Sequence, residues 1–139
     1  ITEALPLLEA GKLVPENQDD AKTCYAALIT KEMGRLDFTK TAVELDRLIR
    51  GLTPWPSAYT FYHGKQLKIW KAIPMATAHK EAPGTILTVD KDSFEVAAAE
   101  GALKVMELQL EGKKRMTTHD FLLGVKVQPG ELLGERRER

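Results

Sequence analysis

Residues 58–73 read AYTFYHGKQLKIWKAI, and this stretch decides the fold. Residues 58–62 have the composition of a β-strand, and His63-Gly64 has the composition of a tight turn. Residues 65–73 then return as a second strand. The stretch therefore predicts a β-hairpin in the middle of the chain.

Downstream of residue 73, short apolar segments recur at hairpin-like spacing. Strands are predicted at residues 85–89, 93–98, 102–110 and 125–127, with turns at 90–92 and 100–101 between the first three. A loop of weak pattern covers residues 74–83. Five or six short strands at this spacing predict a small closed or nearly closed β barrel, either all-β or α+β.

Upstream of the hairpin, residues 41–51 predict the clearest helix. Thr41 and Glu44 have the spacing of a capping box, and Gly51 can end the helix. A second short helix is predicted to start at residues 117–120 and to stop at Gly124. The domain is therefore predicted to be mainly β with one or two short helices.

The N-terminal part has a different composition. Residues 1–10, ITEALPLLEA, predict the last turns of a helix that stops at Gly11. Its leucines pack either on a surface that is not part of this sequence or on this domain, as part of a frayed helix. Residues 11–23 are polar and contain Gly, Pro, Asn and Asp, which is typical of a linker. The charged residues 135–139 predict a disordered tail.

Chain length, cysteine count and the length of the apolar runs exclude some classes of protein. The 139 residues suit one domain with an extension, and the single cysteine, Cys24, excludes an intrachain disulfide. No apolar run is long enough to span a membrane. Twenty basic and twenty acidic residues balance, which argues mildly against a nucleic-acid binder. However, residues 1–25 hold five acids and two bases, so the rest of the chain is net positive, and binding depends on local potential.

No catalytic or metal-binding pattern is present in the sequence. His63, His79 and His119 are isolated from one another and from Cys24. No glycine-rich phosphate loop occurs. We therefore expect no catalysis by this chain alone.

Two basic features could instead bind an anion. Lys113-Lys114-Arg115 follows Gly112, and such a cluster suits phosphate oxygens, although it could also be a solvated surface run. Alternation along the strand at 65–73 puts Lys68 and Trp70 on one face. This pairing occurs on surfaces that stack bases, but a lysine stem that covers a half-buried indole is the more common reason for it.

Several stretches, taken in order, resemble the methionyl-tRNA formyltransferase family. They are KEMGRLDF at 31–38, IRGLTPWPSA at 49–58, LKIWKA at 67–72, APGTIL at 82–87, GAL at 101–103 and LQLEGKKRM at 108–116. The resemblance extends from about Leu5 to Gly134. Leu36, Phe38 and Ser57 depart from the family pattern in ways that indicate packing or turn adjustments.

The resemblance implies a division of the chain. Residues 33–134 would form the family's OB-like C-terminal barrel and residues 11–32 the interdomain linker. Residues 1–10 would be the remnant of the last helix of a missing, Rossmann-like catalytic domain. In the family that domain carries the catalytic residues and the folate pocket. We therefore expect this chain to hold no cofactor and to be inactive alone, although the enzyme uses 10-formyltetrahydrofolate as co-substrate.

The resemblance also implies a role in binding initiator methionyl-tRNA, on which the enzyme formylates the methionyl group. The expected tRNA-binding residues are Lys113, Lys114, Arg115, Lys31, Arg35, Arg50 and Lys68. The expected state is a monomer without membrane contact, in the bacterial cytoplasm or, alternatively, in the mitochondrial or plastid matrix.

Two other functions remain open at this point. The barrel could be a structural part of a related formyltransferase that acts on a small molecule such as a sugar nucleotide. Alternatively, it could be a free-standing OB-type module for single-stranded nucleic acid. The latter needs an exposed aromatic platform, for which the candidates are Tyr59, Phe61, Tyr62 and Trp70, most of which we expect to be buried.

Overall fold

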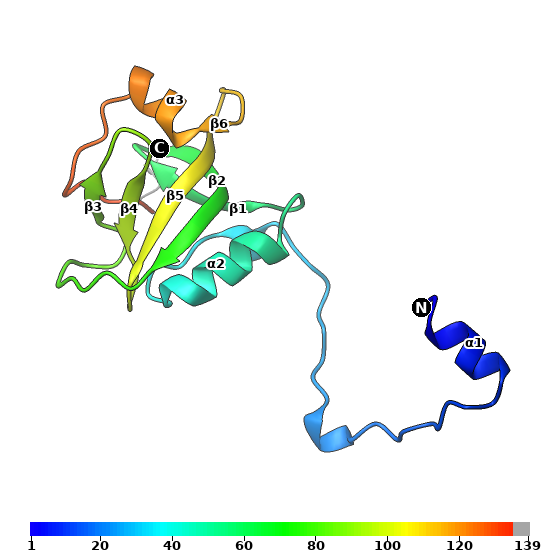
Figure 1. The fold of residues 1–139 in the computed structure, drawn as a ribbon. Helices are drawn as coiled ribbons and strands as arrows, with labels where there is room; N and C mark the ends of the chain where they lie inside the picture. Colours follow the sequence, from blue (N-terminus) through cyan, green and yellow to red (C-terminus); the bar gives the residue numbers. More distant parts are fainter. Residues whose placement is uncertain (135–139) are drawn as a thin grey trace.

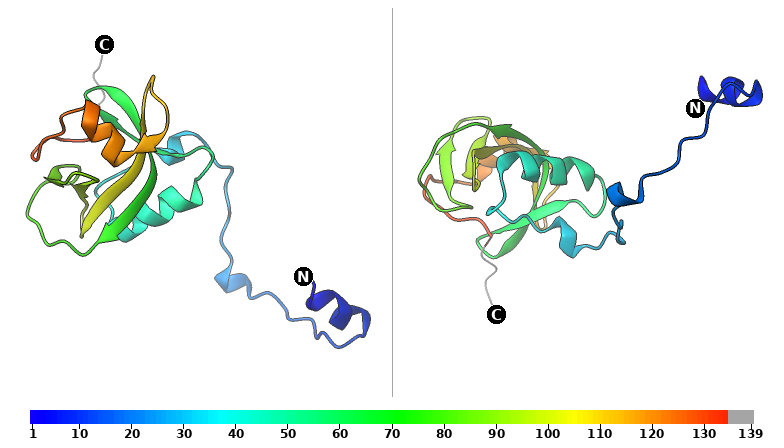
Figure 2. Two further views of the ribbon diagram at one scale, coloured as in Figure 1. Left: turned by 45° about the horizontal axis from the view of Figure 1, so that its top comes forward. Right: turned by 90° about the horizontal axis from the view of Figure 1, so that it is seen from below.

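The computed structural model describes residues 1–134, which form an extended N-terminal arm and a β domain (Figure 1). The arm carries helix α1 (Ala4–Glu9) and a 3-10 turn at Asp20–Lys22, and the side chains of residues 1–33 are all exposed. Figure 2 shows α1 well away from the domain in two further views. The leucines of α1 therefore do not lie on this domain. The tail predicted at 135–139 lies outside the described residues.

The domain is built on one antiparallel sheet of six strands. The strands are β1 (Ala58–Tyr62), β2 (Lys65–Met75), β3 (Ile86–Val89), β4 (Phe94–Ala97), β5 (Ala102–Leu110) and β6 (Met116–Thr117). The order in the sheet is β1-β2-β5-β4-β3, and β6 pairs with β5. The prediction of a mainly β domain with few helices is confirmed.

The hairpin predicted from residues 58–73 is formed by β1 and β2, with Tyr62 opposite Lys65. His63 and Gly64 both have positive φ angles, of 47° and 78°. A two-residue turn with two positive φ angles matches the right-handed twist of the strands it joins. The local sequence therefore sets this register.

The strand predicted at 125–127 is wrong. Val125 ends a helix, since its N–H donates to the carbonyl oxygen of Phe121, and Val127 buries its side chain in the core without entering the sheet. In its place, β6 adds a two-residue strand that the sequence did not indicate.

Strands β1 and β3 lie at opposite ends of the strand order and do not pair, so strand pairing does not close the sheet into a barrel. Residues 128–134 run between these edges. Ile86 N–H donates to the carbonyl of Glu131 at 2.8 Å, and Gly134 N–H donates to the carbonyl of Phe61 at 2.9 Å. We call residues 128–134 the closing segment, because they bond to both edges of the sheet.

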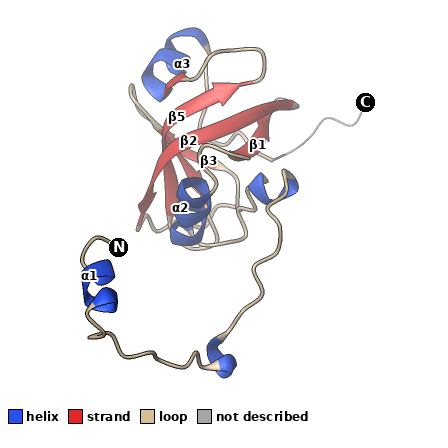
Figure 3. Ribbon diagram, turned by 90° about the vertical axis from the view of Figure 1, so that its right-hand side faces the viewer, coloured by secondary structure: helices blue, strands red, loops and turns tan. Residues whose placement is uncertain are grey.

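Two helices lie at opposite ends of the sheet (Figure 3). Helix α2 (Ala42–Gly51) starts with the predicted capping box, in which Thr41 accepts from the N–H of Glu44 and the Glu44 carboxylate accepts from the N–H of Thr41. This bond lowers the pKa of Glu44. Helix α3 (Thr118–Gly124) is capped by Thr117. A short 3-10 helix, Glu32–Gly34, joins the arm to the domain.

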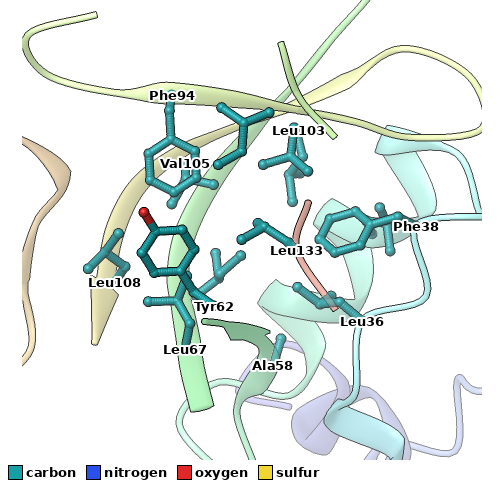
Figure 4. Close-up of a cluster of buried hydrophobic side chains, with 14 of the residues drawn as sticks. Leu36, Phe38, Ala58, Tyr62, Leu67, Phe94, Leu103, Val105, Leu108 and Leu133 are labelled. Atoms are coloured by element: carbon teal, nitrogen blue, oxygen red, sulfur yellow. The ribbon is translucent and has the colours of Figure 1, made fainter. Parts of the chain in front are cut away.

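The core lies between the sheet, α2 and the segments that cover them. Figure 4 shows side chains from β2, β4 and β5 meeting Leu36, Phe38 and Leu133 from outside the sheet. Leu67, Ile69 and Leu108 are essentially inaccessible to solvent. Within the described chain, no helix is long and apolar enough to cross a membrane.

Candidate functional site

The outer face is the side of β1, β2 and β5 that points away from the core. Its half-buried side chains are Tyr59, Phe61, Gln66, Lys68, Trp70, Glu107 and Gln109. They alternate with the buried residues of the same strands, as the pleat of a strand requires. The register places Tyr59 opposite Lys68 and Lys68 opposite Gln109, so these three residues form a row across the strands.

Cations lie over the aromatic rings of this face. Lys68 Nζ lies 5.7 Å and Arg115 Cζ lies 4.8 Å from the centroid of the Trp70 ring. Arg35 Cζ lies 5.8 Å from the centroid of the Phe61 ring. At these distances the ring quadrupole attracts the charge. The sequence correctly placed Lys68 and Trp70 together, in the arrangement of a cation over a half-buried indole.

The basic turn, residues 111–115, joins β5 to β6 at one border of the outer face. Lys113 N–H donates to the carbonyl of Leu110 at 2.9 Å, and Gly112 adopts a positive φ of 80° in open space. All five residues are exposed. The turn is therefore open to solvent.

The three cations of the basic turn differ in their partners. Arg115 forms an ion pair with Glu107, with Nη2 at 2.6 Å and Nε at 3.0 Å from Oε2. No ion pair involves Lys113 or Lys114 within residues 1–134. The two lysines are therefore the cations of this turn without a carboxylate partner, while the Glu111 carboxylate of the same turn accepts from the N–H of Gln66 at 3.0 Å.

The other expected residues lie in three different places. Arg35 joins the outer face, since its backbone bridges Tyr59 and its guanidinium lies over Phe61. Lys31 is exposed where the arm meets the domain. Arg50 lies on α2 and forms an ion pair with Asp46 at 3.0 Å. The structure thus brings Lys68, Arg35 and Arg115 to one face and the two lysines to its border, but it does not bring Arg50 there.

Sequence reasoning missed Glu107 and Gln109. Gln109 Oε1 accepts from the indole N–H of Trp70 at 3.2 Å, and its Nε2 donates to the carbonyl of Lys113 at 3.1 Å. Alternation along the strand predicted at 102–110 could have put both residues on one face. Their partners depend on the register between β2, β5 and β6, which no local pattern indicates.

The aromatic candidates are not an open platform. Tyr62 is buried, and its hydroxyl donates to Glu131 at 2.9 Å. Burial and this carboxylate raise the pKa of Tyr62. Tyr59, Phe61 and Trp70 are half-buried, so fewer of the candidates are fully buried than we expected. Cations lie over two of these three rings.

The histidines are dispersed over the domain. His63 approaches Glu131 at 3.3 Å, His119 approaches Asp92 at 2.9 Å, and His79 approaches the carbonyl of Gly101 at 2.8 Å. Residues 1–134 contain no group of three or more His, Cys, Asp or Glu side chains that could hold a metal ion.

Comparisons with known proteins agree with one another on the family. Residues 28–126 match the sequence model of a family described as "Formyl transferase, C-terminal domain". A methionyl-tRNA formyltransferase of Geotalea uraniireducens is 47% identical over 137 residues, and one of Lachnospira eligens is 46% identical over 140 residues. These alignments cover 98% and 97% of this chain but 43% and 44% of the relatives. The chain thus spans less than half the length of the curated relatives it matches.

Among solved structures, a HypX variant from Aquifex aeolicus aligns with a TM-score of 0.59 at 21% identity, covering 92% of this chain and 24% of that one. HypX in complex with tetrahydrofolic acid aligns with a TM-score of 0.57 at 19% identity, covering 97% and 26%. At these identities the likeness concerns the fold alone.

Proposed function

Because the chain belongs to the formyl transferase C-terminal domain family, we propose that it binds and orients initiator tRNA for a methionyl-tRNA formyltransferase. The observation that carries this proposal is the basic turn, where Lys113 and Lys114 are exposed and have no ion pair among the described residues. Lysines of this kind contact phosphates and position a nucleic acid without reading its sequence.

The zero net charge of the chain is compatible with this role. Lys68, Arg35 and Arg115 lie over aromatic rings of the outer face, and Lys113 and Lys114 lie in the basic turn at its border. The potential near a phosphate depends on such local groups. Arg50 and Lys31 lie outside this cluster, and in the proposed complex they extend the contact toward α2 and the arm.

The proposed division of the chain follows the family. Residues 33–134 form an OB-like barrel whose edges are joined by the closing segment, residues 11–32 are the interdomain linker, and residues 1–10 belong to the last helix of a catalytic domain. The exposed leucines of α1 support the last assignment, since Leu5 and Leu8 are 57% and 62% exposed. Apolar side chains at this density need a partner surface.

In the proposed enzyme, the catalytic residues and the pocket for 10-formyltetrahydrofolate lie in that Rossmann-like domain. This chain then contributes no cofactor ligand and no catalytic group, and it is inactive alone. The relatives are bacterial enzymes, so the proposed site of action is the bacterial cytoplasm, with the chain acting as part of a monomer.

The experiment measures tRNA affinity of the 139-residue chain as a function of salt. Binding should weaken by several orders of magnitude per decade of salt if phosphate contacts dominate. Lys113→Gln with Lys114→Gln should lower the slope of log K against log salt by about 0.7–0.9 for each lysine removed. The matched control is Lys80→Gln with Lys91→Gln, two exposed lysines on loops away from the basic turn.

The control pair should leave the slope unchanged. An affinity that is insensitive to salt, or equal slopes for the two double variants, would rule out phosphate binding by the basic turn. A single-stranded RNA bound more tightly than folded tRNA would instead favour an OB-type stacking module. The cations that lie over the Trp70 and Phe61 rings argue against that module, because a base would have to displace them.

A further inference from the structure

We propose that Gln109 and Trp70 are positioning residues that hold the basic turn in one shape, so that Lys113 and Lys114 are presented to the ligand. The inference rests on the proposed tRNA-binding role of the turn. It adds two residues that carry no charge and touch no phosphate. It also assigns Arg115 to anchoring the turn.

The first step is the orientation of the Gln109 amide. An indole N–H can only donate a hydrogen bond, so the atom that faces Trp70 Nε1 at 3.2 Å must be the amide oxygen. The amide nitrogen then points to the other side, where it donates to the carbonyl of Lys113 at 3.1 Å. Trp70 therefore selects the amide orientation that bonds to the turn.

The second step is the fixation of the turn at three points. The N–H of Lys113 donates to the carbonyl of Leu110, and its own carbonyl accepts from Gln109, so both backbone groups of this residue are bonded. At the far end, the guanidinium of Arg115 is held by Glu107 and stacks over Trp70. Without these bonds, the turn would be held only at Glu111, which bonds to the backbone of Gln66, and Gly112 in open space would leave residues 112–115 free to change conformation.

The third step concerns what each residue contributes to binding. Arg115 already has a carboxylate partner and a ring beneath it, so it serves as an anchor. Lys113 and Lys114 have no carboxylate partner among residues 1–134. A turn that is already ordered loses less conformational entropy on binding, which increases affinity without adding a contact.

A salt titration distinguishes a positioning residue from a residue that contacts phosphate. The slope of log K against log salt counts the phosphates that are neutralised. Replacement of Gln109 removes no charge, so it should lower affinity equally at every salt concentration. Replacement of Lys113 by Gln should lower the slope itself.

The experiment compares Gln109→Leu with Gln66→Leu in the 139-residue chain. Gln66 is also half-buried on the outer face, but no hydrogen bond of its side chain occurs in the described part of the chain. Gln109→Leu should weaken tRNA binding by about threefold to tenfold with an unchanged slope. Gln66→Leu should change neither quantity. Equal affinities for these two variants, or a slope that falls as far as in Lys113→Gln, would overturn the inference.

A second measurement does not depend on tRNA. In the free chain, Gln109→Leu and Trp70→Phe should both accelerate hydrogen exchange at the amide of Lys113, while the amides of β4 keep their protection. Trp70→Phe keeps a ring beneath Arg115 but removes the donor that orients Gln109. Since both changes break one chain of bonds, the double variant should exchange no faster than Gln109→Leu alone.

The two measurements distinguish the two proposals. A chain that fails to bind tRNA but shows the faster exchange disproves the proposed function and leaves the ordering of the turn intact. A chain that binds tRNA with a salt slope but shows unchanged exchange at Lys113 disproves the positioning role alone.

Discussion

The two faces of β2 and β5 differ in burial and in chemistry. On the inner face, Leu67, Ile69 and Leu108 are buried completely. On the outer face, the next residues along the same strands, Lys68 and Gln109, are half-buried, and both contact Trp70: Lys68 lies over its ring and Gln109 accepts from its indole N–H. The comparison shows that alternate residues of a strand can carry separate tasks, stability on one side and recognition on the other.

The largest effect should come from the inner face. Leu108→Ala should destabilise the domain by about 2–5 kcal/mol, because it leaves a cavity among fully packed neighbours. Urea denaturation measures this change. The matched control is Glu107→Ala, one residue away on the outer face, which should cost about 1 kcal/mol or less since its ion pair is partly exposed. Equal costs would remove the distinction between the faces.

A smaller effect is expected where the closing segment meets β1. Burial raises the pKa of Glu131, but hydrogen bonds from the N–H of Gln128, the hydroxyl of Tyr62 and the ring of His63 together lower it below its usual value. A carboxylate with a lowered pKa stabilises the fold above its unfolded pKa, and this contribution is lost as the pH falls through the folded pKa.

Glu131→Gln should therefore cost about 1 kcal/mol near neutral pH, measured by urea denaturation. The difference from the unmodified chain should shrink in acid, below the ordinary carboxyl pKa of about 4.3. A difference that stays constant across this range would mean that the charge of Glu131 does not hold the closing segment.

The smallest effect should come from the outer face itself. Lys68→Met keeps an apolar stem over Trp70 but removes the charge, so stability should change by about 0.5 kcal/mol or less. Affinity for tRNA should fall about twofold to threefold, through the loss of one nearby cation. Equilibrium binding and urea denaturation on the same preparation give both numbers. A large loss of stability would show that the outer face also holds the fold.

Local signals in the sequence were sufficient for several elements. The hairpin at 58–73 depends on two residues that accept positive φ, and helix α2 depends on a cap formed within four residues. The closing segment and β6 depend on pairing between distant parts of the chain. For that reason the strand predicted at 125–127 is wrong. The helix start predicted at 117–120 is correct, since Thr117 caps α3, but no local pattern indicates that Met116 and Thr117 also pair with β5.

The candidate site shows the same limit. Lys113, Lys114 and Arg115 are adjacent in the chain and could be found as a group. The partner of Arg115 is Glu107, which becomes its neighbour only when β6 returns alongside β5. Gln109 and Trp70 are 39 residues apart and meet through the pairing of β2 with β5. Sequence alone therefore identified the charges but not the bonds that orient them.

The closing segment has a consequence for biosynthesis. A ribosome makes the chain from its N-terminus, so the residues that join β1 to β3 are added after every strand of the sheet. Until Glu131 and Gly134 leave the exit tunnel, both edges of the nascent sheet are unpaired. The part of the core that Leu133 later fills is also exposed. Such edges are sites of aggregation, so a chaperone that binds nascent chains would meet this domain in its most vulnerable form just before Gly134 emerges from the exit tunnel.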